Sequence, residues 1–221
     1  MCNISSIIQL NNWCICYNKL VQTRYLDRHP GIRDTFGIVF FVTCVVIGAT
    51  LINSFVFRSF NVDGRSMQPT MHDGDKLIVN KLPVTASQLQ NKEYVPERGQ
   101  IIIFKNPKYD DIKNREEYVV KRVIAFPNER VRLANGVYTV FNSDNPEGFD
   151  PDNDNDGEPA SPTTGQIDVT VPEKTLFVSG DNRTGENSLD SRNGLGFIPF
   201  YDIIGPVSLR IFPFTDIRTF K

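Results

Sequence analysis

An uncharged apolar run over residues 36–57, "FGIVFFVTCVVIGATLINSFVF", constrains this chain more than any other feature of its sequence. As an α-helix it would be about 33 Å long, enough to cross the roughly 30 Å hydrocarbon core of a bilayer. A buried core helix is the alternative, but a fully apolar run of this length is more typical of a membrane span. A cleavable secretory signal fits less well, because its apolar region would be shorter and "RSFNVDG" is no small-x-small site. The run therefore predicts an uncleaved transmembrane anchor.

Basic residues around the run predict its orientation. Four of them precede it, namely Lys19, Arg24, Arg28 and Arg33. Because basic residues near a span stay mainly on the cytoplasmic side, residues 1–35 are expected to form a cytoplasmic tail. Arg58 and Arg65 on the other side weaken this preference without reversing it. We therefore expect a single-pass protein of the cell membrane, with residues 58–221 forming an extracytoplasmic domain.

The composition excludes some classes of function. The 221 residues carry a formal charge of -2 and no long basic stripe, so nucleic acid is not an expected partner. All four cysteines precede residue 50, so the outer domain cannot form disulfides. Cys14 and Cys16 lack the second ligand pair that a structural zinc site requires. We expect no cofactor.

Beyond Arg58 the sequence has the patterns of short strands. The candidates are residues 59–62, 76–79, 100–105, 117–126, 130–133, 137–141, 167–171, 175–180 and 203–212. Asn135-Gly136 predicts a two-residue hairpin between two of these strands. A helix is indicated only around residues 87–93. The fold class is therefore mainly β, a barrel or sandwich that follows one N-terminal transmembrane helix.

Residues 142–165 form an acidic insertion, with seven carboxylates between Asp144 and Glu158 and no basic residue. Asp152, Asp154 and Asp156, followed by Gly157, match the opening of a calcium-binding loop. The twelfth position of that pattern is Thr163, where a bidentate carboxylate is expected. A solvated surface insertion is the simpler interpretation, and the three aspartates stay a candidate calcium site.

Ser66 lies in "NVDGRSMQPTMHDGD", a turn rich in glycine and proline that precedes a strand. As a nucleophile it would need a base. His72 follows too closely unless the chain doubles back, and His29 is expected across the membrane. A Ser-His-Asp triad is therefore disfavoured.

Lys121 is the alternative base. With the period of a strand, Val119, Lys121, Val123 and Ala125 share one face while Arg122 points the other way. On an inward face, desolvation lowers the pKa of a lysine, and a neutral lysine can take a proton from serine. A surface lysine on a strand is the competing interpretation.

A third cluster, "SGDNRTGENSLDSRNGLG", places four charged and several hydroxyl side chains in one irregular stretch, residues 179–196. Fixed charges and hydroxyls of this kind are suited to holding a catalytic group in place. An ion-paired turn without a role in catalysis is the alternative.

Three stretches together resemble the conserved blocks of bacterial type I signal peptidases, which are membrane-anchored Ser/Lys endopeptidases. They are "GRSMQPTMHDGDKLIV", "YVVKRVIAFPNERV" and "LFVSGDNRTGENSLDSR", in the family's order after a membrane span. The resemblance covers about residues 36–213. It implies a signal-peptidase-like β domain and an exported preprotein as substrate, cut after a small-x-small site.

The resemblance also implies roles for individual residues. Ser66 would be the nucleophile, Lys121 the general base, and Ser188 the hydroxyl that orients the lysine. Two ion pairs would hold the site, Asp181 with Arg122 and Asp190 with Arg192. Met67 and Pro69 would belong to the substrate groove and its turn.

Two departures from the family pattern concern the site. Gly64 stands two residues before Ser66, where some members carry a serine that helps to hold the oxyanion. Stabilisation of the oxyanion would then depend on backbone N–H groups, chiefly that of Ser66. Four residues separate Arg183 from Ser188, where the commonest pattern has two.

The sequence thus predicts a monomeric, membrane-bound serine endopeptidase that works through a Ser66/Lys121 dyad and an acyl-enzyme. Its partners would be exported preproteins and the lipid bilayer. A regulatory Ser/Lys protease of related fold is the nearest alternative. A non-catalytic, calcium-dependent extracytoplasmic surface module is the alternative from another class.

Overall fold

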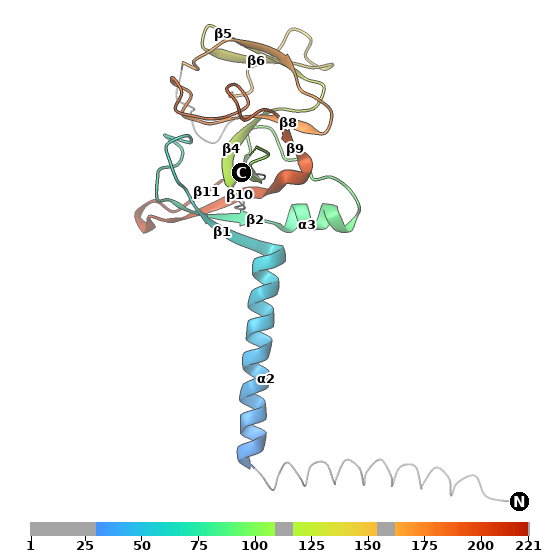
Figure 1. Cartoon of the computed structure of the whole chain (residues 1–221), viewed down its shortest axis with the longest axis vertical. Helices are drawn as coiled ribbons and strands as arrows, with labels where there is room; N and C mark the ends of the chain where they lie inside the picture. Colours follow the sequence, from blue (N-terminus) through green and yellow to red (C-terminus); the bar gives the residue numbers. More distant parts are fainter. Residues whose placement is uncertain (1–29, 109–116, 154–161, 221) are drawn as a thin grey trace, which may run out of the picture. The chain divides into compact units, whose positions relative to one another are not determined.

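The computed structural model describes residues 30–108, 117–153 and 162–220, and the chain divides into two compact units, residues 1–52 and 53–221 (Figure 1). In the first unit, helix α2 covers Pro30–Leu51 and leads into a π-helical turn, Ile52–Val56. Residues Asp34–Val56 are long and apolar enough to cross a membrane, and none of the span is buried. The predicted span is therefore helical, except that Phe57 already opens the first strand.

The second unit contains a large sheet of eight strands. Its strands are β1 (Phe57–Asn61), β2 (Lys76–Asn80), β3 (Ile101–Lys105), β4 (Tyr118–Ala125), β8 (Thr175–Ser179), β9 (Ile198–Pro199), β10 (Ile203–Phe212) and β11 (Arg218–Thr219). They run in the order β1-β2-β10-β3-β4-β8-β9, with β11 beside β10, and all pairings are antiparallel. The expected mainly β class is confirmed.

A separate small sheet of three strands has the order β6-β5-β7 (Figure 1). Its members are β5 (Arg130–Ala134), β6 (Val137–Phe141) and β7 (Ile167–Thr170). The predicted hairpin joins β5 to β6. Asn135 and Gly136 have φ angles of 53° and 81°, as a two-residue turn with two positive φ values requires. The hairpin prediction is confirmed.

Side chains along β3 point alternately into two different hydrophobic clusters of the second unit. Ile101 and Ile103 pack into one cluster with Leu77 and Val207, whereas Ile102 and Phe104 pack into another with Val123 and other residues. This is the period of two expected of a strand buried on both faces. A third cluster joins the small sheet to the end of β4 and to β8, through side chains that include Tyr138, Ile124 and Phe177.

The helix expected around residues 87–93 lies earlier, as α3 (Leu82–Leu89). Pro83 occupies its first turn, where a missing N–H costs no hydrogen bond, and Val84 anchors it in the core. Sequence reasoning did not predict β9, β11 or the two short 3-10 turns, Phe200–Asp202 and Phe214–Asp216. These elements are too short for periodicity to reveal.

The start of α3 is tied to the residues that precede β1. Lys81 N donates to Val56 O at 2.8 Å and Thr85 Oγ1 donates to Phe55 O at 3.1 Å. Lys81 Nζ also donates to Ser54 O. Within the second unit, residues 54–56 are therefore hydrogen-bonded to the start of α3.

Candidate active site

Ser66 lies in the turn between β1 and β2. Val62 N donates to Asp75 O at 2.8 Å and Gly74 N donates to Val62 O at 3.0 Å, which closes the turn at its base. Gly64 has a φ of +96° and donates its N–H to Asp73 Oδ1 at 2.8 Å. A positive φ of this size favours glycine, so this position explains why the turn before Ser66 contains one.

Lys121 reaches Ser66 from β4. Its Nζ lies 2.7 Å from Ser66 Oγ and 3.0 Å from Val120 O, and the residue is 3% exposed. In the sheet Lys121 is paired with Ile102 of β3. The strand pattern left an inward and a surface position open for Lys121, and the structure has the inward one, which brings together two residues that are 55 positions apart.

Burial has a direct electrostatic effect on Lys121. Desolvation lowers its pKa from 10.5 to about 8, although the carboxylates of Asp190 and Asp181 oppose the change. Arg192 adds a smaller lowering effect. A minor fraction of Lys121, about a tenth, is therefore neutral at pH 7, with Ser66 Oγ within hydrogen-bond distance.

Asp181 and Arg122 form one of the two expected ion pairs. Arg122 Nε and NH2 donate to the two carboxylate oxygens at 2.8 and 2.6 Å, and both side chains are fully buried. Arg122 NH1 also donates to Gly99 O at 2.7 Å. Thr70 Oγ1, from the turn after Ser66, donates to Asp181 Oδ2 at 2.5 Å. This pair therefore ties β4 and β8 to the turn that carries the serine.

Asp190 and Arg192 form the second expected pair, through two bonds of 2.9 Å each. Asp190 Oδ2 also accepts from Ser188 Oγ at 2.9 Å, Gly180 N at 3.0 Å and Ser179 Oγ at 3.2 Å. Burial alone would raise the pKa of Asp190, but the hydrogen bonds and charge of Arg192 and the N–H of Gly180 outweigh it and leave the pKa below its usual value. Asp190 is therefore a carboxylate held charged inside the protein.

Ser188 Oγ donates a hydrogen bond to Asp190 Oδ2. Lys121 Nζ is hydrogen-bonded to Ser66 Oγ and to Val120 O. Ser188 itself is fully buried. The orienting role expected for Ser188 toward Lys121 stays a prediction. What the structure assigns to this hydroxyl is a hydrogen bond to the carboxylate that acts most strongly on Lys121.

Gly180 lies where the serine turn and the Ser188 segment meet. A β-carbon on Gly180 would come within 3.0 Å of Ser188 Oγ and of Ser66 O, closer than real β-carbons approach such atoms. Asn182 N, two residues on, donates to Ser66 O at 3.0 Å. Only glycine therefore permits this close approach.

A cavity of about 480 Å³ adjoins Ser66 and Lys121. Its walls are the stretch 60–63 at the end of β1 and the stretch 117–121 of β4, with Leu77 and Ile103 beneath them and Leu189, Gly194 and Leu195 beside them. One end of the cavity is polar, where Asn106 Nδ2 donates to Glu117 Oε2 at 2.8 Å and Lys108 lies nearby.

Met67 and Pro69 do not line this cavity as far as the described residues define it. Met67 is 1% exposed and packs in the core with Val62, Leu77 and Ile101, whereas Pro69 lies exposed on the turn. The geometry therefore gives Met67 a packing role beneath the serine turn. It does not support a place for either residue in the substrate groove.

The backbone N–H groups of Gly64 and Ser66 differ in their hydrogen bonding. The N–H of Gly64 is committed to Asp73 Oδ1. Among the described residues no acceptor is recorded for the N–H of Ser66, which leaves it available to an oxyanion. Of the two residues expected at the oxyanion site, Ser66 can donate directly, and Gly64 shapes the turn.

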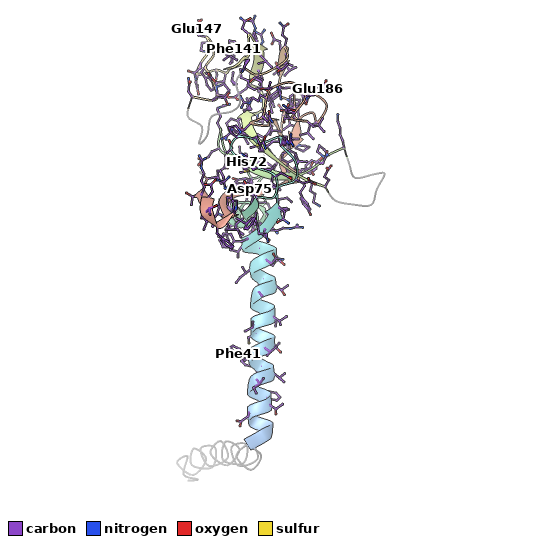
Figure 2. The ribbon with its side chains drawn as sticks, turned by 90° about the vertical axis from the view of Figure 1, so that its left-hand side faces the viewer. Phe41, His72, Asp75, Phe141, Glu147 and Glu186 are labelled. Atoms are coloured by element: carbon purple, nitrogen blue, oxygen red, sulfur yellow. The ribbon has the colours of Figure 1, made fainter. Side chains whose placement is uncertain are left out.

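His72 lies apart from this site. It lines a different cavity, of about 250 Å³, together with Asp73, Arg210 and Phe212. Its backbone N–H donates to the neighbouring Asp75 Oδ2 at 2.9 Å, and the two residues are seen close together in Figure 2. The geometry agrees with the expectation that His72 is not the base for Ser66.

The candidate calcium residues divide between described and undescribed parts of the chain. Asp154 and Asp156 lie outside the described residues, whereas Asp152 forms a two-bond ion pair with Arg183. Within the described ranges no group of three or more acidic, histidine or cysteine side chains could hold a metal ion. The carboxylate of Asp152 is therefore engaged by a guanidinium.

Sequence reasoning missed three residues that support the site, namely Thr70, Tyr138 and Ser179. Tyr138 OH donates to Ser179 Oγ at 3.2 Å, and Ser179 in turn donates to Asp190. Alternation along β6 marks Tyr138 as inward-facing, but nothing in the sequence shows that the small sheet packs behind residues 179–196.

Comparison with known proteins shows the family of the chain. A family model described as "Signal peptidase, peptidase S26" matches residues 33–212. The chain is 33% identical to a signal peptidase I of Bacillus amyloliquefaciens over 184 residues, covering 81% of this chain and 89% of that protein. It is 34% identical to signal peptidase I T of Bacillus subtilis (strain 168) over 182 residues, covering 81% and 86%.

A crystal structure of a signal peptidase I from Enterococcus faecalis V583 also matches, with a TM-score of 0.38 at 26% identity over 52% of this chain and 97% of that one. The match of the family model and the identity to the two Bacillus enzymes decide the assignment. The chain belongs to the signal peptidase, peptidase S26, family of serine hydrolases that remove signal peptides.

Proposed function

We propose that this protein is a membrane-bound endopeptidase that removes signal peptides from exported preproteins with Ser66 as nucleophile and Lys121 as general base. The observation that carries the proposal is the 2.7 Å approach of Lys121 Nζ to Ser66 Oγ on a buried strand face. A general base must lie within hydrogen-bond reach of the proton it removes and be partly unprotonated at the working pH. The distance and the pKa of about 8 meet both conditions.

In the proposed mechanism, neutral Lys121 takes the hydroxyl proton as Ser66 Oγ attacks the carbonyl carbon of the scissile bond. The bond from carbon to nitrogen then breaks, and the ammonium of Lys121 gives its proton to the departing amine. Ser66 is left esterified to the signal peptide. A water molecule, deprotonated by Lys121, then attacks this ester. The bond to Ser66 Oγ breaks, the ammonium of Lys121 returns its proton to that oxygen, and the signal peptide leaves with a free carboxylate.

The developing oxyanion would be stabilised by the N–H of Ser66. Gly64 fixes the turn through its bond to Asp73 but has its own N–H committed there. The ion pairs of Asp181 with Arg122 and of Asp190 with Arg192 would hold the strand and the turn in register. They would also keep two carboxylates near Lys121 largely neutralised, which limits how far they raise its pKa.

The cavity and the edge of β4 suggest how an extended substrate would bind. β8 pairs with β4 from Arg122 onward, so that no partner strand for Val119–Lys121 is seen on this side among the described residues. A peptide could add there, main chain to main chain. Apolar walls from Val62, Leu77 and Val120 would then accept small side chains, which is consistent with cleavage after a small-x-small site.

The lipid bilayer is the second proposed partner. Residues Asp34–Val56 would form a single span with the N-terminus in the cytoplasm, and β1 begins at the next residue. Ser66 follows Phe57 by only nine positions, so the serine would work close to the membrane surface on its outer side. We propose that one copy of the chain suffices, because the serine and the lysine come from the same chain.

A cleavage assay tests this proposal. Purified full-length protein in detergent would be incubated with a preprotein-derived peptide that contains a small-x-small site, and the products identified by mass. We expect one cut after that site, lost in Ser66→Ala and in Lys121→Met. Lys92→Met is the matched control, because Lys92 is exposed on the turn after α3. Cleavage that survives in either of the first two variants would contradict the dyad.

A further inference from the structure

Arg183 is a buried charged residue near the site that has no role in the mechanism proposed above. It is 1% exposed, and its pKa is raised because the hydrogen bonds and charge of Asp152 outweigh the desolvation that would lower it. NH2 donates to Asp152 Oδ1 at 2.9 Å, and NH1 donates to Asp152 Oδ2. Its partner comes from the acidic insertion. A buried guanidinium with a single carboxylate partner depends strongly on that partner.

Arg183 also contacts the side of the site that lies away from the substrate cavity. Its Nε donates to Gly180 O at 3.0 Å, and its guanidinium carbon lies 4.9 Å from the centre of the Tyr138 ring. Gly180 is the glycine packed against Ser66 O and Ser188 Oγ, and its N–H donates to Asp190. One arginine therefore fixes the peptide group on which both segments of the site pack.

Tyr138 provides a second route from the small sheet to the same carboxylate. Its ring stacks on Arg183, while its OH donates to Ser179 Oγ, which donates to Asp190 Oδ2. Tyr138 is 1% exposed, and burial raises its pKa, so it is a neutral donor at any working pH. The Arg183 guanidinium is thus held between an aromatic ring and a carboxylate.

The far end of the acidic insertion contacts the same segment. Thr164 N donates to Arg183 O at 2.9 Å, and Gly185 N donates to Thr164 Oγ1 at 2.7 Å. Gly185 lies in the four-residue stretch that separates Arg183 from Ser188. Arg192 NH1 donates to Thr164 O at 3.1 Å. Thr164 of the insertion therefore stabilises the segment between Arg183 and Ser188 by hydrogen bonds.

We propose that Asp152 is a positioning residue for the serine chemistry. It holds Arg183 against Tyr138, and Arg183 holds Gly180 and Asp190 in place between Ser66 and Ser188. This inference rests on the proposed function, since it concerns the geometry of the same Ser66 and Lys121. It gives the acidic insertion a role in catalysis through an ion pair inside the protein.

The test compares Asp152→Asn with Asp144→Asn in the full-length protein and the peptide assay. Both changes remove one negative charge from the acidic insertion. Asp144 is exposed, and among the described residues its carboxylate accepts only from the adjacent Ser143, at 3.4 Å. We expect Asp152→Asn to lower kcat about tenfold or more, because a buried arginine loses its counterion. KM should change less than threefold, since the cavity walls come mainly from β1 and β4.

Two further variants separate positioning from loss of stability. Asp152→Glu keeps the carboxylate and should retain more of kcat than Asp152→Asn. In the double variant Asp152→Asn/Arg183→Met the unpaired charge is gone. Its kcat relative to the unaltered protein should therefore be higher than the product of the relative kcat values of the two single variants. All kcat values would be measured at least 15 °C below the melting temperature of the variant concerned, so that unfolding does not contribute.

Each outcome decides the matter. A selective fall in kcat with rescue by glutamate supports the inference. Equal kcat in Asp152→Asn and Asp144→Asn would overturn it, and so would a lower melting temperature with unchanged kcat, because the pair would then only stabilise the fold. If the unaltered protein did not cleave the peptide, that result would contradict the proposed function itself. The comparison of variants tests only the role of Asp152.

Discussion

Lys121 Nζ lies 2.7 Å from Ser66 Oγ, although the lysine is on the buried strand β4 and the serine is in the turn between β1 and β2. Desolvation lowers the pKa of this lysine to about 8, and the two carboxylates that act against the change are each paired with an arginine. The arrangement supplies a serine with a base that is partly neutral near pH 7 without any histidine. This relationship underlies the predictions below.

Gly180→Ala should damage the site through sterics alone. A β-carbon there would press on Ser66 O and Ser188 Oγ, and neither backbone nor buried hydroxyl can move without disturbing the bonds described above. We expect a loss of about 1–3 kcal/mol in the free energy of unfolding, and a fall of about a hundredfold in kcat. Denaturant unfolding and the peptide assay measure the two effects. Gly148→Ala, another crowded glycine, is the control, because a β-carbon there would press on Thr139 and Phe141 instead of on Ser66 and Ser188. A Gly180→Ala enzyme with full kcat would show that the close approach is not needed.

Lys121→Met should stabilise the protein while abolishing cleavage. The pKa of Lys121 in the folded state is below its unfolded value, so the unfolded chain binds more protons between about pH 8 and pH 10.5. The cost of burying the lysine is therefore present in full below about pH 8 and fades as the pH rises toward 10.5. An apolar side chain avoids this cost, on the order of 3 kcal/mol below pH 8.

Unfolding of the wild type and of Lys121→Met at pH 6.5 and at pH 10 checks this prediction. The excess stability of the variant should be largest at the lower pH and smaller at the higher one. If the variant exceeded the wild type in stability by the same amount at both pH values, the lysine would be better solvated than its 3% exposure indicates.

Ser188→Ala should weaken the enzyme without abolishing cleavage. The hydroxyl donates to Asp190 Oδ2 at 2.9 Å, and Asp190 is the carboxylate with the largest effect on Lys121. Without that bond the charge of Asp190 acts more strongly on the lysine and raises its pKa. The acid limb of the pH profile should move to higher pH, and kcat should fall roughly tenfold. Thr184→Ala, at an exposed position in the same segment, serves as the control. An unchanged pH profile in Ser188→Ala would separate this hydroxyl from the charge network.

Chelation of calcium should leave activity and melting temperature unchanged. Asp152 would be the first ligand of the candidate calcium loop, but both of its carboxylate oxygens accept from Arg183. A melting curve with and without excess chelator tests the point. A clear drop in melting temperature, absent in Asp154→Asn, would show that the insertion does bind the ion.

Local patterns in the sequence predicted those parts of the molecule that repeat a short period. Alternation placed Lys121 on one strand face with Val119 and Val123, without deciding whether that face is buried, and the Asn135-Gly136 pair predicted the hairpin, because both depend on neighbours along the chain. The start of α3 was placed too late, since Leu82–Leu89 has only two turns and its signal lies mainly in Pro83.

Contacts between irregular segments could not be predicted in this way. The pair of Arg183 with Asp152 joins two stretches without periodicity, 31 positions apart, and depends on how the small sheet packs. Met67 was expected in the substrate groove because it follows the nucleophile in the sequence. Its side chain packs in the core beneath the turn, and a place in the groove stays a prediction.

The pH dependence of kcat/KM for cleavage of a preprotein peptide tests the central claim most directly. If neutral Lys121 is the base, kcat/KM should rise with pH along an acid limb with an apparent pKa of about 8, and Lys121→Met should show no cleavage at any pH. An acid limb above pH 10, or cleavage by Lys121→Met with a similar profile, would contradict the account.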